Sequence, residues 1–232
     1  MEPEALEIPV ELAGQGTVSG WLDLPGSDSG RCVLLLAHGA GAGATHPFLQ
    51  AVARGLAARG LPVLRFQYAH AERALREGRR RPPDRRPALE SVHASALAYL
   101  RERFPDRRLL LLGKSMGGRM GTYLAAEGAD CAGLVLLGYP LHPPGRPDEL
   151  RSEHFGAIAQ PALFLQGTRD ALCDLELLTP ALELWGGPLS LHVVEGADHG
   201  FEVLKQSGRT HEEVLEEICD AIDEWERATF PL

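Results

Sequence analysis

Short apolar runs alternate with amphipathic stretches along most of the chain. The apolar runs carry hydrophobic residues at nearly every position, which is typical of strands buried on both faces of a parallel sheet. They cover residues 31–37, 61–66, 109–112 and 189–194, with further runs ending near residue 137 and beginning near residue 162. Amphipathic stretches predict helices at 47–58, 87–103, 116–126, 148–158 and 207–228. This alternation predicts an α/β fold with a mostly parallel sheet and helices on both faces.

The first two strands follow a different pattern. Residues 5–12 and 17–24 are separated by a glycine-rich stretch at 14–16 and predict an antiparallel hairpin at one edge of the sheet. The sheet should therefore have about seven to eight strands. The chain has 232 residues, 44% of them hydrophobic, and contains no linker, tandem repeat or long low-complexity run, so we expect one domain over residues 1–232.

A G-x-S-x-G pattern at residues 113–117 joins a predicted strand to a predicted helix. In this context the pattern is typical of a nucleophile elbow, a tight turn that presents a serine in a strained backbone conformation. Glycines two residues before and after the serine avoid side-chain collisions in such a turn. Ser115 is therefore the candidate nucleophile.

A serine nucleophile needs a general base and an acid that orients the base, in the chain order Ser, Asp or Glu, His. Asp170 follows the strand that begins near residue 162, and Asp174 lies four residues further on. Aspartates after strands commonly cap helices, so Asp174 could replace Asp170 as the acid and leave Asp170 to cap the segment that starts at residue 175; we favour Asp170 as the acid. His199 lies in a glycine-flanked loop after the strand 189–194 and is the candidate base, in preference to His192 within that strand.

The oxyanion of an acyl-transfer reaction needs two backbone donors. The first is the amide of Met116, directly after the nucleophile. The second lies in the glycine-rich loop at 38–43, where Ala40 is favoured and Gly41 is the alternate. The loop lacks the G-x-G-x-x-G register and the G-K-[ST] ending of nucleotide-binding loops, so a nucleotide site is not expected.

These motifs together resemble an α/β-hydrolase. They are His38-Gly39-Ala40-Gly41, residues 113–119, residues 167–170 and Asp198-His199. More narrowly, residues 65–68, 78–83 and 138–142 are similar to the dienelactone-hydrolase-like branch and, within it, to the small KANSL/Tex-type hydrolase-like domains. The likeness extends from about residue 6 to 225. Dienelactone hydrolases carry a cysteine at the nucleophile position, so Ser115 argues against dienelactone itself as the substrate.

The resemblance implies an α/β-hydrolase fold and a serine hydrolase acting on carboxylic esters, thioesters or lactones through an acyl-enzyme. Two alternatives remain open. The subgroup includes subunits of chromatin complexes, which implies an interaction module with little or no turnover. Acyl transfer to another acceptor on the same machinery is the other. Only a short helix fits between the strands near residues 137 and 162, so we expect a minimal cap or none, and small acyl substrates.

Charge is unevenly distributed. The net charge of −9 argues against nucleic acid or an anionic membrane as partner. Seven arginines nevertheless gather between residues 73 and 86. They predict either a solvated loop paired with acidic residues, such as those of the carboxy-terminal helix, or recognition of a substrate anion by Arg79, Arg80 and Arg81.

The sequence shows no signal for a membrane span, a disulfide framework or a metal site. No apolar run reaches the roughly eighteen residues that a span needs, and residues 1–4 have no basic leader, so we expect a cytoplasmic protein. Cys32, Cys131, Cys173 and Cys219 are widely spaced, which predicts free thiols, with Cys173 accessible, and neither a disulfide nor zinc. No cofactor is expected, and the expected partner is a small ester-type molecule.

Overall fold

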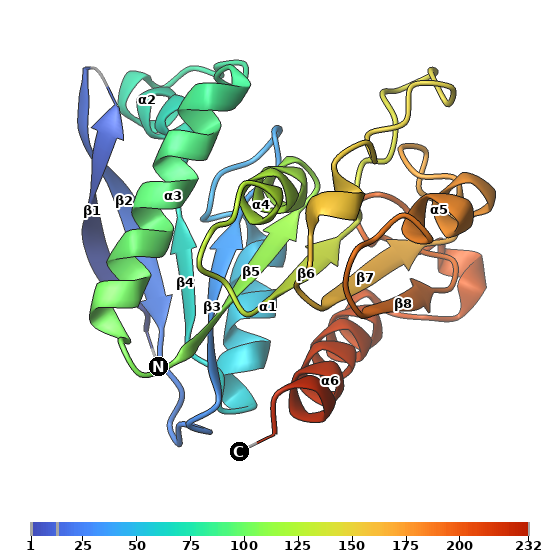
Figure 1. Ribbon diagram of the computed structural model, residues 1–232. Coiled ribbons are helices and arrows are strands. Elements are labelled where there is room, and N and C mark those ends of the chain that lie inside the picture. The colour runs from blue at the N-terminus through green and yellow to red at the C-terminus, as the bar shows by residue number, and fades with distance from the viewer. Residues whose placement is uncertain (1, 13, 232) are drawn as a thin grey trace.

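A computed structural model describes residues 2–12 and 14–231, which form one eight-stranded sheet in the order β1-β2-β4-β3-β5-β6-β7-β8 (Figure 1). The strands are β1 (Glu4–Leu12), β2 (Gln15–Asp23), β3 (Cys32–Ala37), β4 (Val63–Phe66), β5 (Arg108–Lys114), β6 (Gly133–Leu137), β7 (Ala162–Gly167) and β8 (Leu189–Val194). The strands from β4 to β8 pair in parallel, whereas β2 pairs antiparallel with both β1 and β4. The predicted fold class, strand number and edge hairpin are therefore confirmed.

The central strands are apolar on both faces, as a parallel sheet between two helical layers requires. In β3, Val33 and Leu35 belong to the core on one face, whereas Leu34 and Leu36 belong to the core on the other. All four side chains are fully buried. This is why the run has no polar alternation.

Helices cover both faces of the sheet (Figure 1). The helices are α1 (Pro47–Ala58), α2 (Ala69–Glu77), α3 (Arg86–Arg103), α4 (Met116–Ala126), α5 (Leu175–Leu182) and α6 (His211–Thr229), with short 3₁₀ turns η1 (Phe155–Ala157) and η2 (Lys205–Ser207). Helices α1 and α6 pack against one another over one core, and α3, α4 and α5 contribute to the other. Among the described residues, no helix combines the length and hydropathy that crossing a bilayer requires.

The helix predicted at 148–158 is wrong. Only η1 forms there, within the segment of residues 138–161 that joins β6 to β7. The stretch lacks a continuous apolar stripe: Leu150 is 40% exposed, and Phe155 is the one aromatic anchor, packed edge-on against Phe164 and Trp185. The connection thus forms no helical cap over the carboxyl edge of the sheet.

Some local boundaries also differ from the prediction. Strand β2 begins at Gln15, earlier than the glycine-rich stretch suggested, while residue 13 lies outside the described residues. Helix α2 was not predicted, because its sequence is short and highly charged. It ends at Gly78, which lies in the left-handed region with φ of 65°. Asp174, one candidate acid, caps α5 by accepting a hydrogen bond from the Glu176 amide at 2.8 Å.

Candidate active site

The candidate nucleophile lies in a strained turn between β5 and α4. Ser115 has φ of 52° and ψ of −114°, a region that non-glycine residues rarely adopt. Its amide donates to the Leu137 carbonyl of β6 at 3.0 Å. A methyl group on Gly113 would lie 2.2 Å from the Gly118 nitrogen, and one on Gly117 would lie 2.4 Å from the Ala37 oxygen. Glycine is therefore required on both sides of Ser115.

The structure brings Ser115, His199 and Asp170 into one hydrogen-bonded chain. His199 Nε2 lies 2.8 Å from Ser115 Oγ, and His199 Nδ1 lies 2.8 Å from Asp170 Oδ2. The side chain of Asp170 is fully buried and that of His199 is 28% exposed. Because a carboxylate accepts, Nδ1 donates to Asp170, which leaves Nε2 to accept the proton of Ser115.

Asp170 is held by further donors at the end of β7. Its Oδ2 accepts from Gln166 Nε2 at 2.5 Å, and its Oδ1 accepts from the Leu172 amide at 2.8 Å. These bonds fix the carboxylate plane toward His199. Of the two acids left open by the sequence, Asp170 lies beside His199, and Asp174 is occupied as a helix cap.

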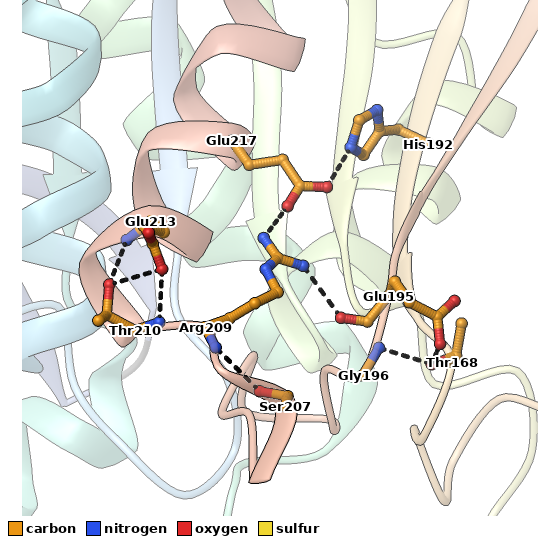
Figure 2. Close-up of polar contacts among 9 residues, drawn as sticks. All are labelled: Thr168, His192, Glu195, Gly196, Ser207, Arg209, Thr210, Glu213 and Glu217. Atoms are coloured by element: carbon orange, nitrogen blue, oxygen red, sulfur yellow. Dashed lines mark hydrogen bonds and ion pairs between the residues drawn. The ribbon is translucent and has the colours of Figure 1, made fainter. Parts of the chain in front are cut away.

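The loop that carries His199 is anchored on several sides. Figure 2 shows its first residues: Gly196 N donates to Thr168 Oγ1 at 2.9 Å, and Arg209 Nη1 donates to the Glu195 carbonyl at 3.0 Å. Arg209 also pairs with Glu217, whose other oxygen lies 2.8 Å from His192 Nε2. His192 thus belongs to a partly exposed network with Glu217 and Arg209 (Figure 2).

The residues predicted to supply the oxyanion donors lie directly after Ser115 or in the loop that passes beside it. Met116 is the first residue of α4, where helical amides have no partner within the helix. The loop containing Ala40 and Gly41 passes against the elbow, since a methyl group on Gly39 would lie 3.6 Å from Ser115 Cβ. Ala40, Gly41 and Ser115 line the same cavity.

This loop is clamped by the end of β4. The Ala44 amide donates to Gln67 Oε1 at 2.7 Å, and the Ala44 carbonyl accepts from Arg65 Nη1 at 2.9 Å. Arg65 is itself paired with buried Asp23 at 2.8 Å. Further up the loop, His38 Nε2 accepts from the Tyr68 amide at 3.0 Å. Burial lowers the pKa of His38 to about 4, which keeps the ring neutral and able to accept.

The cavity above Ser115 has a volume of about 460 Å³. Its walls are largely apolar, with Phe48, Leu49 and Leu172 on the sides, and they include the polar side chains of His46 and Lys114. A larger hollow of about 890 Å³ lies along α6, but it is lined mainly by carboxylates and contains no serine or cysteine nucleophile. The candidate chemistry therefore belongs to the smaller cavity.

The arginine segment does not enter this cavity. Arg79 and Arg81 both pair with Glu77, at 2.9 and 2.6 Å, and their hydrogen bonds lower the pKa of that carboxyl. Arg80 and Arg81 line a separate hollow of about 280 Å³ that shares Ala40 and Gly41 with the cavity above Ser115. Within the described part of the chain, Arg80 has no ion-pair partner.

The expected pairing of this segment with the carboxy-terminal helix is wrong. The ion pairs that the segment forms are local or reach neighbouring helices: Arg73 pairs with Asp84, and Arg86 pairs with Glu90 and Glu127. The carboxylates of α6 instead pair with Arg31, Arg59, Arg209 and Arg227.

The expected accessibility of Cys173 is also wrong. Cys173 is 2% exposed, and burial raises the pKa of its thiol well above the usual range. Cys32, Cys131 and Cys219 are likewise buried free thiols. Over the described residues, no three side chains of the types that ligate metals come together as a site.

Sequence reasoning missed several residues that shape the site. Gln166 was part of an apolar strand pattern, and its role behind Asp170 emerges only from the fold. Gln67 and Arg65 could have been noticed, because two polar residues at the end of a buried strand need partners. Lys114 lay inside the elbow pattern but was given no role.

The comparisons with known proteins agree with this fold. A model of the α/β hydrolase domain family matches residues 30–227, most of the chain, and the chain belongs to that family. The likeness to the dienelactone-hydrolase-like branch is one of fold. The narrower likeness to KANSL/Tex-type domains stays a prediction.

Solved structures share the fold over nearly their whole length. Dienelactone hydrolase from Anabaena variabilis ATCC 29413 is 22% identical, with 99% of each chain covered and a TM-score of 0.72. Est1E from Butyrivibrio proteoclasticus is 16% identical, with 97% of this chain and 99% of that chain covered and a TM-score of 0.73. XC6422 from Xanthomonas campestris, described as an α/β serine hydrolase without lid, is 19% identical, with coverages of 100% and 97% and a TM-score of 0.72.

Proposed function

We propose that this protein is a serine hydrolase that cleaves carboxylic esters, thioesters or lactones of small acyl groups. One observation carries the proposal: Ser115, at a strained elbow, is hydrogen-bonded to His199, which is hydrogen-bonded to buried Asp170, and the serine faces a cavity. Membership of the α/β hydrolase family supports hydrolase activity.

The reaction follows from the contacts of these groups. Ser115 Oγ attacks the carbonyl carbon while its proton passes to His199 Nε2, and Asp170 stabilises the imidazolium that forms. The amides of Met116 and Ala40 donate to the oxyanion of the tetrahedral intermediate. Collapse of the intermediate breaks the acyl–oxygen or acyl–sulfur bond, and His199 returns the proton to the leaving group. Water then attacks the acyl-enzyme by the same route and releases the acid and Ser115.

The proposed substrates are small because of the shape of the cavity. Its volume of about 460 Å³ and its apolar walls suit a short acyl chain. The connection from β6 to β7, described over its full length, forms only one short helical turn and supplies no helical cap to shelter a long chain. A hexadecanoyl group would extend into solvent and gain little from burial.

A panel of p-nitrophenyl esters tests this proposal. Purified protein should hydrolyse the acetate, butyrate and hexanoate with higher kcat/KM than the palmitate, with detergent held constant across the panel. Faster turnover of the palmitate would overturn the small-acyl assignment. If no ester is hydrolysed and a fluorophosphonate probe leaves the protein unlabelled, the fold serves as an interaction module instead.

Acyl transfer to other acceptors requires a separate comparison. With one acyl donor and an added alcohol or hydrogen peroxide, the free acid should remain the main product. Formation of the transferred ester or peracid as the main product would assign the protein as an acyltransferase or perhydrolase.

A further inference from the structure

Lysine is rare in this chain, and one of its two lysines lies half-buried beside the candidate nucleophile. The sequence has 23 lysines and arginines, of which only Lys114 and Lys205 are lysines. Lys205 is exposed in η2, whereas Lys114 directly precedes Ser115 at the end of β5. Because arginine occupies nearly all other cationic positions of the chain, the lysine beside Ser115 calls for a structural reason.

The ammonium group of Lys114 reaches the loop that carries His199. Lys114 Nζ donates to the His199 carbonyl at 2.5 Å and lies 5.4 Å from the centre of the Phe201 ring. Phe201 is fully buried and has φ of 63°, a strained conformation that packing must maintain. Lys114 therefore joins the end of β5, directly before Ser115, to the loop that begins after β8.

A glycine opens the space in which these groups meet. Gly138 follows β6 with φ of 60°. A methyl group placed on it would lie 3.0 Å from Lys114 Nζ and 3.5 Å from both Asp170 Oδ2 and the His199 carbonyl. The ammonium, the carboxylate and the carbonyl thus converge on one point beside His199.

We infer that Lys114 is a positioning residue for the proposed reaction: its charged ammonium group holds the His199 loop against the elbow and faces Asp170, so that His199 Nε2 stays within hydrogen-bonding distance of Ser115 Oγ. The inference rests on the proposed function. A hydrogen bond from a charged donor is roughly twice as strong as a neutral one, so the charge of Lys114 matters as well as its length.

The charge state of Lys114 should change near the physiological range. Burial lowers the pKa of Lys114 to about 8, against the opposing effect of Asp170 and Asp198. The other ionisable group at this point is His199, whose carbonyl Lys114 contacts. The ammonium form is therefore complete below pH 7 and is lost as the pH rises through about 8, after which the amine still reaches the carbonyl but holds it more weakly.

The kinetic test uses Lys114→Met, which keeps the length of the side chain and removes the donor and the charge, with Lys205→Met as the matched control. On p-nitrophenyl butyrate, Lys114→Met should lower kcat by about 10- to 100-fold, because a misplacement of about 1 Å can cost about 100-fold in rate. KM should change less than threefold. Wild-type kcat should fall as the pH rises through about 8, and this inflection should disappear in Lys114→Met and persist in Lys205→Met.

Two results would overturn the inference. One is a Lys114→Met enzyme with kcat within twofold of wild type. The other is a Lys114→Met enzyme of low activity that keeps the wild-type alkaline inflection, since this would make Lys114 a packing residue only. Urea unfolding of each variant accompanies the assay, so that rates are compared per folded molecule.

A measurement on the wild-type protein needs neither turnover nor a stable variant. With lysine labelled by ¹³C at Cε, two signals are expected, and Lys205→Arg identifies the one from Lys205. The Lys114 signal should titrate near pH 8. Titration of Lys114 below pH 7 would overturn the inference, because the amine would then be uncharged at neutral pH, and it would leave the proposed function standing if Ser115 still reacts with a fluorophosphonate.

Discussion

The buried pair of Arg65 and Asp23 links the stability of the fold to the loop beside Ser115. The side chains are 1% and 3% exposed, and Arg65 also donates to the Ala44 carbonyl of the loop. Arg65→Met would remove both bonds. Asp23 would then be a buried carboxylate without a partner, because its other oxygen already has none among the described residues.

The cost of this change can be worked out from the contacts. Breaking a buried ion pair by removing one member costs about 3–5 kcal/mol. The orphaned Ala44 carbonyl adds about 1–3 kcal/mol. We therefore expect Arg65→Met to lower the free energy of unfolding by on the order of 5 kcal/mol, which is a large part of the roughly 5–15 kcal/mol that a domain has in total.

The assay is urea unfolding at pH 7, followed by circular dichroism. The double variant Asp23→Leu/Arg65→Met should recover most of the loss, because replacing both charges by apolar groups is often neutral. Arg107→Met, which breaks the partly exposed pair with Asp28, is the control and should cost at most about 1 kcal/mol. A loss below 1 kcal/mol for Arg65→Met, or a double variant no more stable than the single one, would show that this pair does not stabilise the fold.

Three further predictions concern the acid, the pH dependence of stability and the arginine segment. Asp170→Asn should lower kcat by about 10⁴-fold, because the amide favours the wrong tautomer of His199. Asp174→Asn keeps a good helix cap and should lower kcat by less than threefold. A reversed order in steady-state assays would make Asp174 the acid. Burial lowers the pKa of His38 to about 4 and that of His93 to about 3. The unfolded chain therefore binds protons more readily than the folded one, and the free energy of unfolding falls as the pH drops below about 6.5. Urea unfolding should show a loss of about 2 kcal/mol per histidine between pH 7 and 5, and a constant free energy of unfolding would contradict this prediction. Arg80→Gln should raise KM for a hemisuccinate ester at low salt and leave KM for its methyl-capped analogue unchanged. The effect should disappear near 0.15 M salt, where charges are screened over about 8 Å. Equal wild-type KM values for the two esters would indicate that the segment is a solvated loop without a role in substrate binding.

Features with local signals could be predicted from the sequence. The strand before Ser115 and the helix after it follow from an apolar run and a series of small residues, and the glycines of the elbow are dictated by contacts of 2.2 to 2.4 Å. The position of His199 follows because loops after parallel strands meet at one edge of the sheet.

Features that depend on long-range partners could not be predicted. Arg65 and Asp23 are 42 residues apart, and Lys114 and His199 are 85 residues apart, so no spacing along the chain relates them. The arginine segment was misjudged for the opposite reason, since its partners Glu77 and Asp84 lie within the segment itself and not in the distant α6. The helix predicted at 148–158 does not form because, without an apolar stripe to pack against the core, the stretch cannot offset the cost of helix formation.

The central claim is that Ser115 is the nucleophile, and labelling by a fluorophosphonate probe tests it most directly. The wild-type protein and Ser190→Ala, which changes an exposed serine on β8, should be labelled, and the adduct should be found on the peptide that contains Ser115. Ser115→Ala should fold normally, lose all labelling and lose about 10⁴- to 10⁶-fold in kcat. A folded Ser115→Ala protein that is still labelled, or that keeps more than a tenth of wild-type activity, would contradict the account.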